Sequence, residues 1–399
     1  MDRMLNALRR RRFARGALSR RRLCPVCDSP CLLGRVIAIQ DRLPHRRETC
    51  VTQRLPTGRH LYLSVMTSGI ALMFLDVPAF AGAPLSYLRG YGQKADTVAW
   101  LTWGVLVISL AVTVIIALLL VAAIWHGHNA AIQNLDGAQT LARPVGGLNW
   151  IWIGVGLSSL VLLFSIVWTL RVLARVSAPP VKPALTIEIT GRQWWWQVRY
   201  LSDDPARVFA TANEIHIPVG VPVQFRLIGG DVIHSFWVPA LSGKTDMIPG
   251  QTNELWLDAH EPGVYRGQCG EYCGVEHAHM GFLVVAQTPA AFRAWWDHQL
   301  QSPLSAADGQ LAVGAADFNA HCGSCHAVRG TDAAGVLGPD LSHLMTRRTI
   351  AAAMLSNNPT NLARWIRDPQ GVKPGNMMQA AEISPTELTG ILTYLQTLN

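Results

Sequence analysis

The sequence predicts a multidomain membrane protein that combines a two-helix transmembrane hairpin, a β domain and a further C-terminal domain. Two runs, 97–125 and 144–170, contain no charged side chain, and each exceeds the roughly 20 residues that span a bilayer's hydrocarbon. Residues 184–287 instead alternate short β-rich runs with Gly and Pro turns, which is typical of a β-sandwich or barrel. A chain of 399 residues that is 50% hydrophobic has room for two or three domains.

The first 83 residues are predicted to be a basic leader that contains a signal peptide. Residues 1–60 carry 15 Arg and no Lys against 4 acidic residues, a balance of +11, so the rest of the +8 chain is −3. The charge therefore belongs to the leader and does not indicate nucleic-acid binding, although an arginine-rich arm is the rival interpretation. The apolar stretch 61–80 and the small-residue site AFA at 79–81 favour a secretory signal, with a start at Met66 as an alternative. Four leader cysteines are expected to have no role, a zinc knuckle being the alternative: Cys24, Cys27, Cys31 and Cys50.

Residues 269–280 read CGEYCGVEHAHM and place two thiols, an imidazole and a thioether in one loop. Soft sulfur with imidazole suits copper, and one Cys, two His and a weak Met describe a single blue-copper centre. The second Cys is one thiolate too many for that centre, but two thiolates can bridge two copper ions. His234 is the best candidate for the second His. The pattern indicates a two-copper electron-transfer site, and a Cys269–Cys273 disulfide is the alternative.

A second metal signature is the C-x-x-C-H motif formed by Cys322, Cys325 and His326. This is the attachment motif of c-type haem, in which the His binds the iron. Zinc or a redox dithiol is the competing interpretation, but no second Cys/His pair follows at zinc spacing. The run GPDL at 338–341 resembles the cytochrome c loop whose proline carbonyl orients the axial His. The run KPGNMM at 373–378 resembles the loop that supplies the axial Met.

Met378 aligns with the axial ligand of the cytochrome c pattern. Gln379 stands where a proline usually follows, so Met377 stays an alternative, whereas Met345 and Met354 are assigned to the core. The run SPTE at 384–387 predicts a capping box with proline at the first helical position. Five residues then form one apolar stripe suited to packing over a haem or a core: Leu388, Ile391, Leu392, Leu395 and Leu398.

The 269–280 loop, the His234 segment and the run GRQWWW at 191–196 together resemble subunit II of the haem–copper cytochrome c oxidases, over roughly residues 96–296. This resemblance implies a dinuclear copper centre, CuA, in a cupredoxin-like domain. The implied ligands are His234, Cys269, Cys273, His277, Met280 and the backbone carbonyl of Glu271. The carboxylate of Glu271 is implied to hold Mg or Mn at the interface with subunit I, where Lys244 and Asp246 also match the family.

The resemblance also gives Trp194 the role of receiving electrons near the copper. On a strand, Trp194 and Trp196 would share one face and Trp195 the other, and core packing is preferred for Trp195 and Trp196. The fused C-terminal domain resembles that of the caa-type oxidases. The expected domains are a transmembrane hairpin at 84–176 (helices about 97–125 and 148–172), a cupredoxin-like CuA domain at 184–298 and an all-α class I cytochrome c domain at 308–399.

Oxygen reduction in this class needs a bundle of intramembrane histidines, and the hairpin offers only His126 and His128. The chain is therefore expected to be the electron-accepting subunit of a proton-pumping terminal oxidase, passing electrons from a donor through haem c and CuA to subunit I. The expected partners are subunits I and III and a donor such as a cytochrome c or bc1 complex, without nucleic acid. A CuA-containing nitric oxide reductase subunit is the first alternative, and a membrane-anchored carrier without an enzymatic partner is the second.

The expected location is the bacterial plasma (inner) membrane, crossed twice, with both metal domains on the periplasmic side. The positive-inside rule opposes this orientation. Arg143 is the one cationic side chain between the two helices, whereas five flank their outer ends: Arg89, Lys94, Arg171, Arg175 and Lys182. Haem attachment and thiolate copper loading belong, by the family resemblance, outside the plasma membrane, and this chemistry outweighs the small charge difference.

Overall fold

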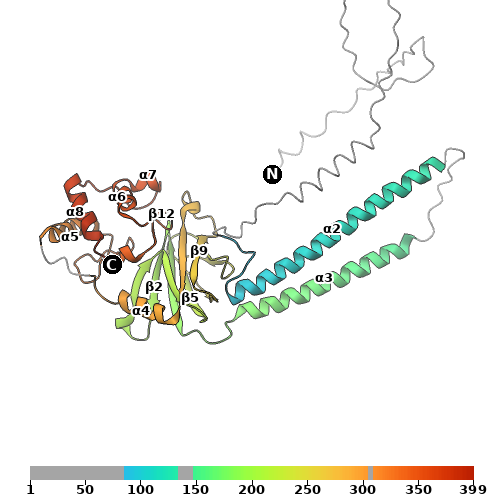
Figure 1. The fold of residues 1–399 in the computed structure, drawn as a ribbon, viewed down its shortest axis with the longest axis horizontal. Helices are drawn as coiled ribbons and strands as arrows, with labels where there is room; N and C mark the ends of the chain where they lie inside the picture. The colour runs from blue at the N-terminus through green and yellow to red at the C-terminus, as the bar shows by residue number, and fades with distance from the viewer. Residues whose placement is uncertain (1–84, 134–146, 304–308) are drawn as a thin grey trace, which may run out of the picture. The chain divides into compact units, whose positions relative to one another are not determined.

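The computed structural model describes residues 85–133, 147–303 and 309–399 (Figure 1). The predicted signal peptide, the leader cysteines, Met66 and Arg143 lie outside the described residues. The leader and its cleavage site therefore stay predictions.

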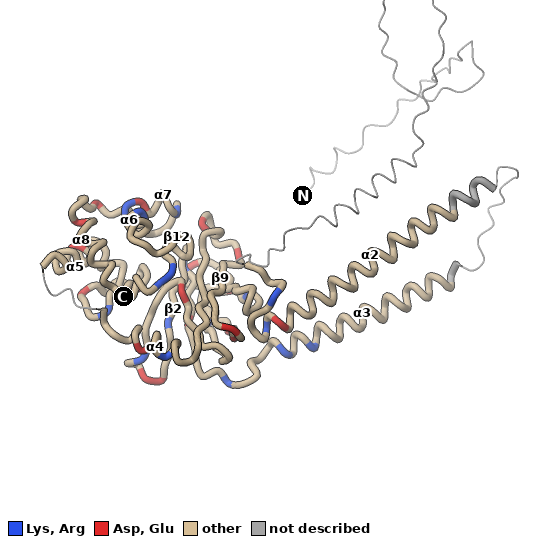
Figure 2. The backbone as a smooth tube through the Cα atoms, in the orientation of Figure 1, with Lys and Arg blue, Asp and Glu red and all other residues tan. Residues whose placement is uncertain are grey.

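Two long helices form the predicted hairpin. α2 (Gln93–Gln133) and α3 (Gly147–Ser177) run alongside each other, and Gly104 of α2 faces the indole of Trp168 on α3. α2 has no charged side chain after Asp96, and α3 has none before Arg171. The charged residues of both helices lie near the ends that meet the β domain (Figure 2). Their apolar side chains are largely exposed. The segments Gln93–His126 and Asn149–Ser177 are long and apolar enough to cross a membrane.

The outer ends of both helices are hydrogen bonded to the β domain. Ahead of α2, the Tyr91 amide donates to the Ala240 carbonyl at 2.8 Å, and the Gln93 amide donates to the Asp258 carboxylate at 2.9 Å. At the end of α3, the Trp256 indole donates to the Val176 carbonyl at 3.1 Å. Both helices therefore leave the β domain from anchored ends.

The β domain consists of two five-stranded sheets. The first has the order β3-β2-β1-β5-β8 and the second the order β4-β10-β9-β6-β7, with β1–β5 and β4–β10 parallel and the other pairs antiparallel. The strands are β1 (Leu185–Arg192), β2 (Trp195–Leu201), β3 (Phe209–Ala212), β4 (Glu214–Pro218), β5 (Val223–Gly229), β6 (His234–Trp237), β7 (Thr245–Met247), β8 (Thr252–Leu257), β9 (Gly263–Cys269) and β10 (Gly281–Gln287).

Alternating side chains of these strands make the core between the sheets. Along β1 and β2 buried residues recur at every second position, as expected for strands with one face inward. Trp196 is fully buried, and its ring lies 5.9 Å from that of Phe236 and 5.0 Å from that of Phe282, centroid to centroid. The short helices η1 (Pro205–Arg207) and η2 (His277–His279) lie in loops, and α4 (Pro289–Gln299) follows β10.

The structure corrects the prediction for the tryptophan run. Trp194 lies in the turn between β1 and β2, because β1 ends at Arg192 and β2 begins at Trp195. The strand alternation therefore applies to Trp195 and Trp196 alone. Core packing is confirmed for Trp196, but it is wrong for Trp195, which is only half-buried and lines a cavity shared with the C-terminal domain.

The C-terminal domain is mainly helical. Its elements are α5 (Gly309–Cys322), η3 (Leu344–Thr346), α6 (Pro359–Arg367), α7 (Pro369–Val372) and α8 (Pro385–Leu395), with a minimal pair of strands, β11 (Thr349–Ile350) and β12 (Leu355–Ser356). α5 crosses α8 where Gly314 meets the backbone of Gly390, so that a side chain at Gly314 would clash. The predicted capping box of Ser384 and Glu387 is present at the start of α8.

The predicted apolar stripe of α8 faces the core of this domain. Leu388, Ile391, Leu395 and Leu398 are buried in the same cluster as Phe318 of α5, and Leu392 packs against that cluster. Of the two methionines assigned to the core, Met345 packs against the cluster and Met354 is half-buried.

Candidate metal centre and haem site

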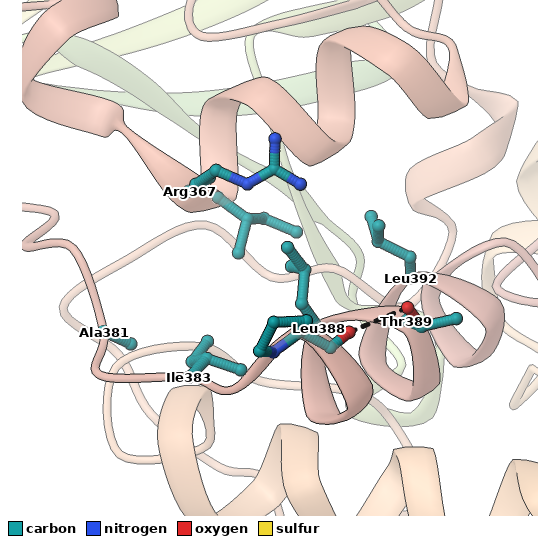
Figure 3. Close-up of a pocket in the computed structure, with 8 residues that line it drawn as sticks. Arg367, Ala381, Ile383, Leu388, Thr389 and Leu392 are labelled. Carbon is teal, nitrogen blue, oxygen red and sulfur yellow. Dashed lines mark hydrogen bonds between the residues drawn. The ribbon is translucent and has the colours of Figure 1, made fainter.

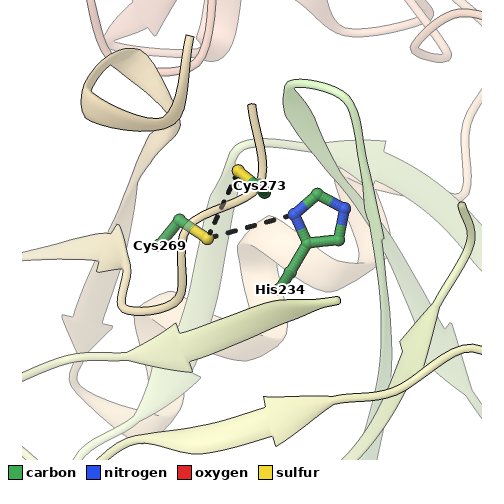
Figure 4. A group of neighbouring side chains, drawn as sticks. All are labelled: His234, Cys269 and Cys273. Atoms are coloured by element: carbon green, nitrogen blue, oxygen red, sulfur yellow. Dashed lines mark hydrogen bonds between the residues drawn. The ribbon is translucent and has the colours of Figure 1, made fainter. Parts of the chain in front are cut away.

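The predicted copper ligands converge at one edge of the second sheet. His234 is the first residue of β6, and Cys269 is the last residue of the neighbouring strand β9. The 269–280 loop joins β9 to β10, and its base is closed by a bond from the Cys269 amide to the Met280 carbonyl at 3.0 Å. His234, Cys269 and Cys273 point toward one another in Figure 4. Pairing between strands therefore brings His234 to the loop.

The donor atoms lie close enough to share metal ions. The Cys269 sulfur is 3.8 Å from the Cys273 sulfur, 3.9 Å from His234 Nδ1 and 3.2 Å from the Glu271 carbonyl oxygen. The Cys273 sulfur is 3.6 Å from His277 Nδ1 and 3.8 Å from the Met280 sulfur. A disulfide would hold the two sulfurs at about 2.05 Å, so this geometry is that of two free thiols.

Acidity and burial agree with a metal site. The close contact between the two thiols lowers the pKa of Cys269 and raises the pKa of Cys273. A lowered thiol pKa favours the thiolate, which is the form that binds metals. His234, Cys269, Cys273 and Met280 are all buried. Two sulfurs, two imidazoles, a thioether and a carbonyl are a donor set that fits copper.

Asp231 orients the predicted ligand His234, and the sequence pattern alone did not reveal this role. Its carboxylate lies 2.7 Å from His234 Nε2 and accepts bonds from the amides of Gln193 at 2.6 Å and Val232 at 2.7 Å. Burial alone would lower the pKa of His234, but the bonds to Asp231 and Cys269 outweigh it and raise that pKa. A proton held on Nε2 leaves Nδ1 free toward the sulfurs, the usual arrangement of a carboxylate behind a metal-binding His.

Replacing Asp231 with Asn is expected to lower copper affinity by about 10–100-fold, the usual cost of losing such an outer partner. Competition of the purified protein with a copper chelator measures this change. Asp203→Asn, at an exposed loop position, is the matched control and should bind copper normally. Equal affinity in the two variants would contradict the role of Asp231.

The turn that carries Trp194 is bonded directly to the copper loop. The side-chain amide of Gln193 and the indole of Trp194 both donate to the carbonyl of Cys273, at 2.7 and 2.9 Å. Gly274 has a φ of +118°, and a Cβ there would lie 2.9 Å from the Trp194 ring. Glycine is therefore required at Gly274 both by its backbone conformation and by the close approach of Trp194.

His279 does not join the predicted ligands. Its Nδ1 is 2.6 Å from the buried carboxylate of Glu276, and its side chain is about half exposed. His277, whose Nδ1 lies 3.6 Å from the Cys273 sulfur, is therefore the histidine of this loop that lies beside the thiols.

The C-x-x-C-H motif closes the end of α5. Cys322 is the last residue of that helix, and the His326 amide donates to the Cys322 carbonyl at 2.9 Å. His326 Nδ1 lies 2.8 Å from the Pro339 carbonyl, which confirms the bond expected from the GPDL run. Burial lowers the pKa of His326 and so keeps the ring neutral, as a metal ligand must be.

A cavity of about 420 Å³ opens beside this motif. Its walls include Cys322, Cys325, His326 and the apolar side chains of Leu344 and Leu395. Arg347 also lines it: Nη2 donates to the Asp340 carbonyl, whereas the buried Nε has no partner among the described residues. Two thiols, a neutral imidazole, apolar walls and an unsatisfied cationic donor suit the thioether bonds, iron and carboxylates of a haem.

The β domain supplies part of the wall of this cavity. Gln193, Trp194, Trp195 and Asn213 line it together with the C-terminal domain. Trp194 therefore touches the cavity on one side and is hydrogen bonded to Cys273 on the other.

A smaller hollow of about 410 Å³ lies between α6 and α8 (Figure 3). It shares Ile366, Ala381 and Ile383 with the first cavity, so it is an extension of the same apolar region. The bond from Thr389 Oγ1 to the Pro385 carbonyl, 2.8 Å long, lies along its edge.

Met378 and Met377 both line the first cavity, but they differ in burial. Met378 packs against the apolar cluster of the domain, and its amide donates to Asn376 Oδ1 at 2.7 Å. Met377 is 77% exposed. This difference supports Met378 as the axial ligand.

Comparison with known proteins gives the family. The profile of the cytochrome c oxidase subunit II periplasmic domain matches residues 199–287, and that of cytochrome c matches residues 311–399. The chain is 34% identical over 319 residues to cytochrome c oxidase subunit 2 of Alkalihalophilus pseudofirmus, a match that spans 78% of this chain and 91% of that relative. The chain belongs to the cytochrome c oxidase subunit 2 family.

Two further proteins are similar to parts of this chain. The subunit 2 of Bacillus sp. strain PS3 is 33% identical over 229 residues, spanning 54% of this chain and 63% of that protein. A crystal structure of the periplasmic domain of subunit II from Bradyrhizobium japonicum is 33% identical, covering 30% of this chain and 95% of that one, with a TM-score of 0.27.

Family membership confirms the predicted architecture of two apolar helices, a cupredoxin-like β domain and a C-terminal cytochrome c domain. It implies CuA copper in the first domain, haem c in the second and a partner subunit I. A membrane protein with periplasmic domains fits both the helices and the matched periplasmic domain.

Proposed function

We propose that this chain is the subunit through which electrons enter a proton-pumping terminal oxidase. Electrons pass from an external donor through haem c and dinuclear CuA to subunit I, which reduces oxygen to water. The observation that carries the proposal is the position of Trp194, whose indole donates to the Cys273 carbonyl at 2.9 Å while its ring lines the cavity beside His326. One residue thus contacts both predicted redox sites.

Both sites supply one-electron redox chemistry when loaded, and the residues of the chain hold and orient them. Cys269 and Cys273 would hold the copper together with His234, His277, Met280 and the Glu271 carbonyl. Cys322 and Cys325 would attach the haem, and His326 and Met378 would bind its iron. Because His234, Cys269, Cys273 and Met280 are buried, little water has to reorganise around them when the charge of the site changes.

The surface toward subunit I is assigned to the loop of Lys244 and Asp246. Lys244 Nζ lies 3.2 Å from the Glu271 carboxylate and 3.4 Å from that of Asp246, and the three side chains are each about half exposed. They are accessible to a partner. A Mg or Mn ion bound by the Glu271 carboxylate would have to take the place of Lys244, a prediction that metal analysis of the assembled complex tests.

We further infer that the protein lies in the bacterial plasma membrane, that subunit III is a second partner, and that a cytochrome c or bc1 complex is the electron donor. Purification of the intact complex, with metal and haem analysis and assays of oxygen and nitric oxide consumption, tests these together. Oxygen uptake by a complex that contains a polytopic haem protein is expected. Consumption of nitric oxide alone would indicate the reductase alternative, and isolation as a lone chain would indicate a simple carrier.

Trp194→Leu is expected to slow electron transfer from haem to copper by roughly tenfold or more, because it removes the ring that contacts both sites. Flash reduction of the haem, followed at the copper absorbance, measures the rate. Trp150→Leu, an exposed position at the start of α3, is the control. A normal rate in Trp194→Leu would remove this residue from the path.

A further inference from the structure

Lys373 is a buried cation of the C-terminal domain whose amine is bonded to the β domain. Its Nζ donates to the Trp194 carbonyl at 2.6 Å and to the His279 carbonyl at 2.8 Å. The residue is only 2% exposed. A single ammonium group therefore joins the two domains at the turn of Trp194 and at the copper loop.

Burial makes this contact specific. A charged group removed from water is strongly destabilising unless hydrogen bonds replace its hydration. Desolvation lowers the pKa of Lys373, so the charged amine depends on its two carbonyl acceptors. A small shift of the loop would leave the amine buried without its acceptors, so one relative position of the loop and Trp194 is favoured over its neighbours.

The loop that carries Lys373 is internally braced and leads to Met378. The Lys373 amide donates to the Pro369 carbonyl at 2.9 Å. The side-chain amide of Gln370 donates to the carbonyls of Asn376 at 2.8 Å and Met378 at 2.9 Å. Because these bonds tie the two ends of the loop, the position of Lys373 also sets the position of Met378.

The two acceptors lie on the copper side of the proposed path. Trp194 is bonded through its indole to Cys273, and His279 lies in the loop between the predicted ligands His277 and Met280. A Cβ at Gly375, in the same loop as Lys373, would lie 3.3 Å from Val275 and 3.6 Å from the Trp194 ring. The loop of the axial Met therefore packs directly on Trp194 and the copper loop.

We propose that Lys373 is a positioning residue for electron transfer, because its amine fixes the axial-methionine loop against Trp194 and the copper loop. This inference rests on the proposed function, since it assumes that electrons pass between the two sites. It adds a residue that binds neither metal and acts through the relative placement of the two domains.

Other hydrogen bonds between the domains do not involve Trp194 and provide a control. Arg266 Nη1 donates to the Ala353 carbonyl at 3.1 Å, the Gly281 amide donates to the Ala352 carbonyl at 3.1 Å, and the Arg348 amide donates to the Glu214 carboxylate at 2.9 Å. Arg266→Met removes a cation that bridges the domains but leaves Trp194 and its contacts intact. It separates general docking from positioning by Lys373.

The test compares Lys373→Met, Arg266→Met and the exposed-site variant Lys182→Met in the full chain within its complex. Absorbance and EPR spectra establish that both sites are loaded, hydrogen exchange reports on peptides that contain residues 370–378 and 193–195, and flash reduction gives the rate from haem to copper. We expect Lys373→Met to keep both spectra, to exchange faster in these peptides and to transfer electrons about tenfold more slowly. The two control variants should match the parent chain in rate.

A parent-like rate and exchange in Lys373→Met would overturn the inference, as would an equal slowing in Arg266→Met. Absence of rapid transfer in the parent chain itself would instead overturn the proposed function. If Lys373→Met does not assemble, Lys373→Gln, which keeps a neutral N–H donor, is measured in the same way. A slower rate together with faster exchange in that variant supports positioning, and a parent-like rate despite faster exchange contradicts it.

Discussion

Replacing Cys273 with Ser is expected to abolish the mixed-valence copper spectrum while the haem c spectrum remains. The Cys273 sulfur lies within 3.8 Å of the Cys269 sulfur, His277 Nδ1 and the Met280 sulfur, so it occupies the middle of the predicted centre. A serine hydroxyl is a hard, poorly acidic ligand that does not replace a bridging thiolate. The loss of activity should exceed the about 10–100-fold cost of losing an outer-shell partner.

EPR, copper content per chain and oxygen uptake of the purified complex measure this effect. Ala278→Ser is the matched control, because it introduces the same hydroxyl at an exposed position of the same loop and removes no predicted ligand. Survival of the copper spectrum in Cys273→Ser would contradict the dinuclear site. So would a parent protein with a Cys269–Cys273 disulfide and no copper.

Replacing Met378 with Leu is expected to remove the thioether from the haem and lower its reduction potential. Axial ligands set haem potentials over about 0.8 V, and a Met opposite the His raises the potential. The loss should therefore be a large shift that weakens transfer of electrons to or from the haem. The copper spectrum should not change, because Met378 lies in the other domain. Redox titration and the haem absorbance of the purified chain measure both effects.

Met377→Leu is the matched variant for this prediction. It removes the same atoms from the neighbouring position, where the side chain is 77% exposed, and it should leave the haem potential unchanged. A shift confined to Met377→Leu would assign the axial role to Met377 instead.

The hairpin and the metal motifs could be predicted from the sequence because their signals are local. An uncharged run of more than about 20 residues has few stable environments other than a membrane. Cys269, Cys273, His277 and Met280 lie in one short loop, so only a few backbone dihedrals separate their donor atoms. The same is true of Cys322, Cys325 and His326. His234 is distant in sequence, so only its residue type and the family resemblance point to it.

The orientation of the tryptophan run could not be predicted from strand alternation, because alternation holds only while one strand continues. The turn at Gln193 and Trp194 ends β1 and restarts the chain as β2, so Trp194 faces Cys273 and Trp195 faces the haem cavity. Asp231 lies three positions before His234, but a carboxylate near a histidine in sequence does not by itself indicate that the two side chains are bonded. Its bonds to the Gln193 amide and His234 became evident only in the folded chain.

By itself the sequence determined which chemical groups this subunit can hold and that two of its segments are apolar enough for a membrane. The spacing of residues along the chain is sufficient to predict these groups, because the ligand types and their short-range geometry depend on residues that are close in sequence. Only the tertiary structure decided how the two sites face each other: Lys373 reaches Trp194 across 179 positions. Such contacts depend on the packing of surfaces that are remote in sequence, and this packing produces no periodicity or motif from which it could be predicted.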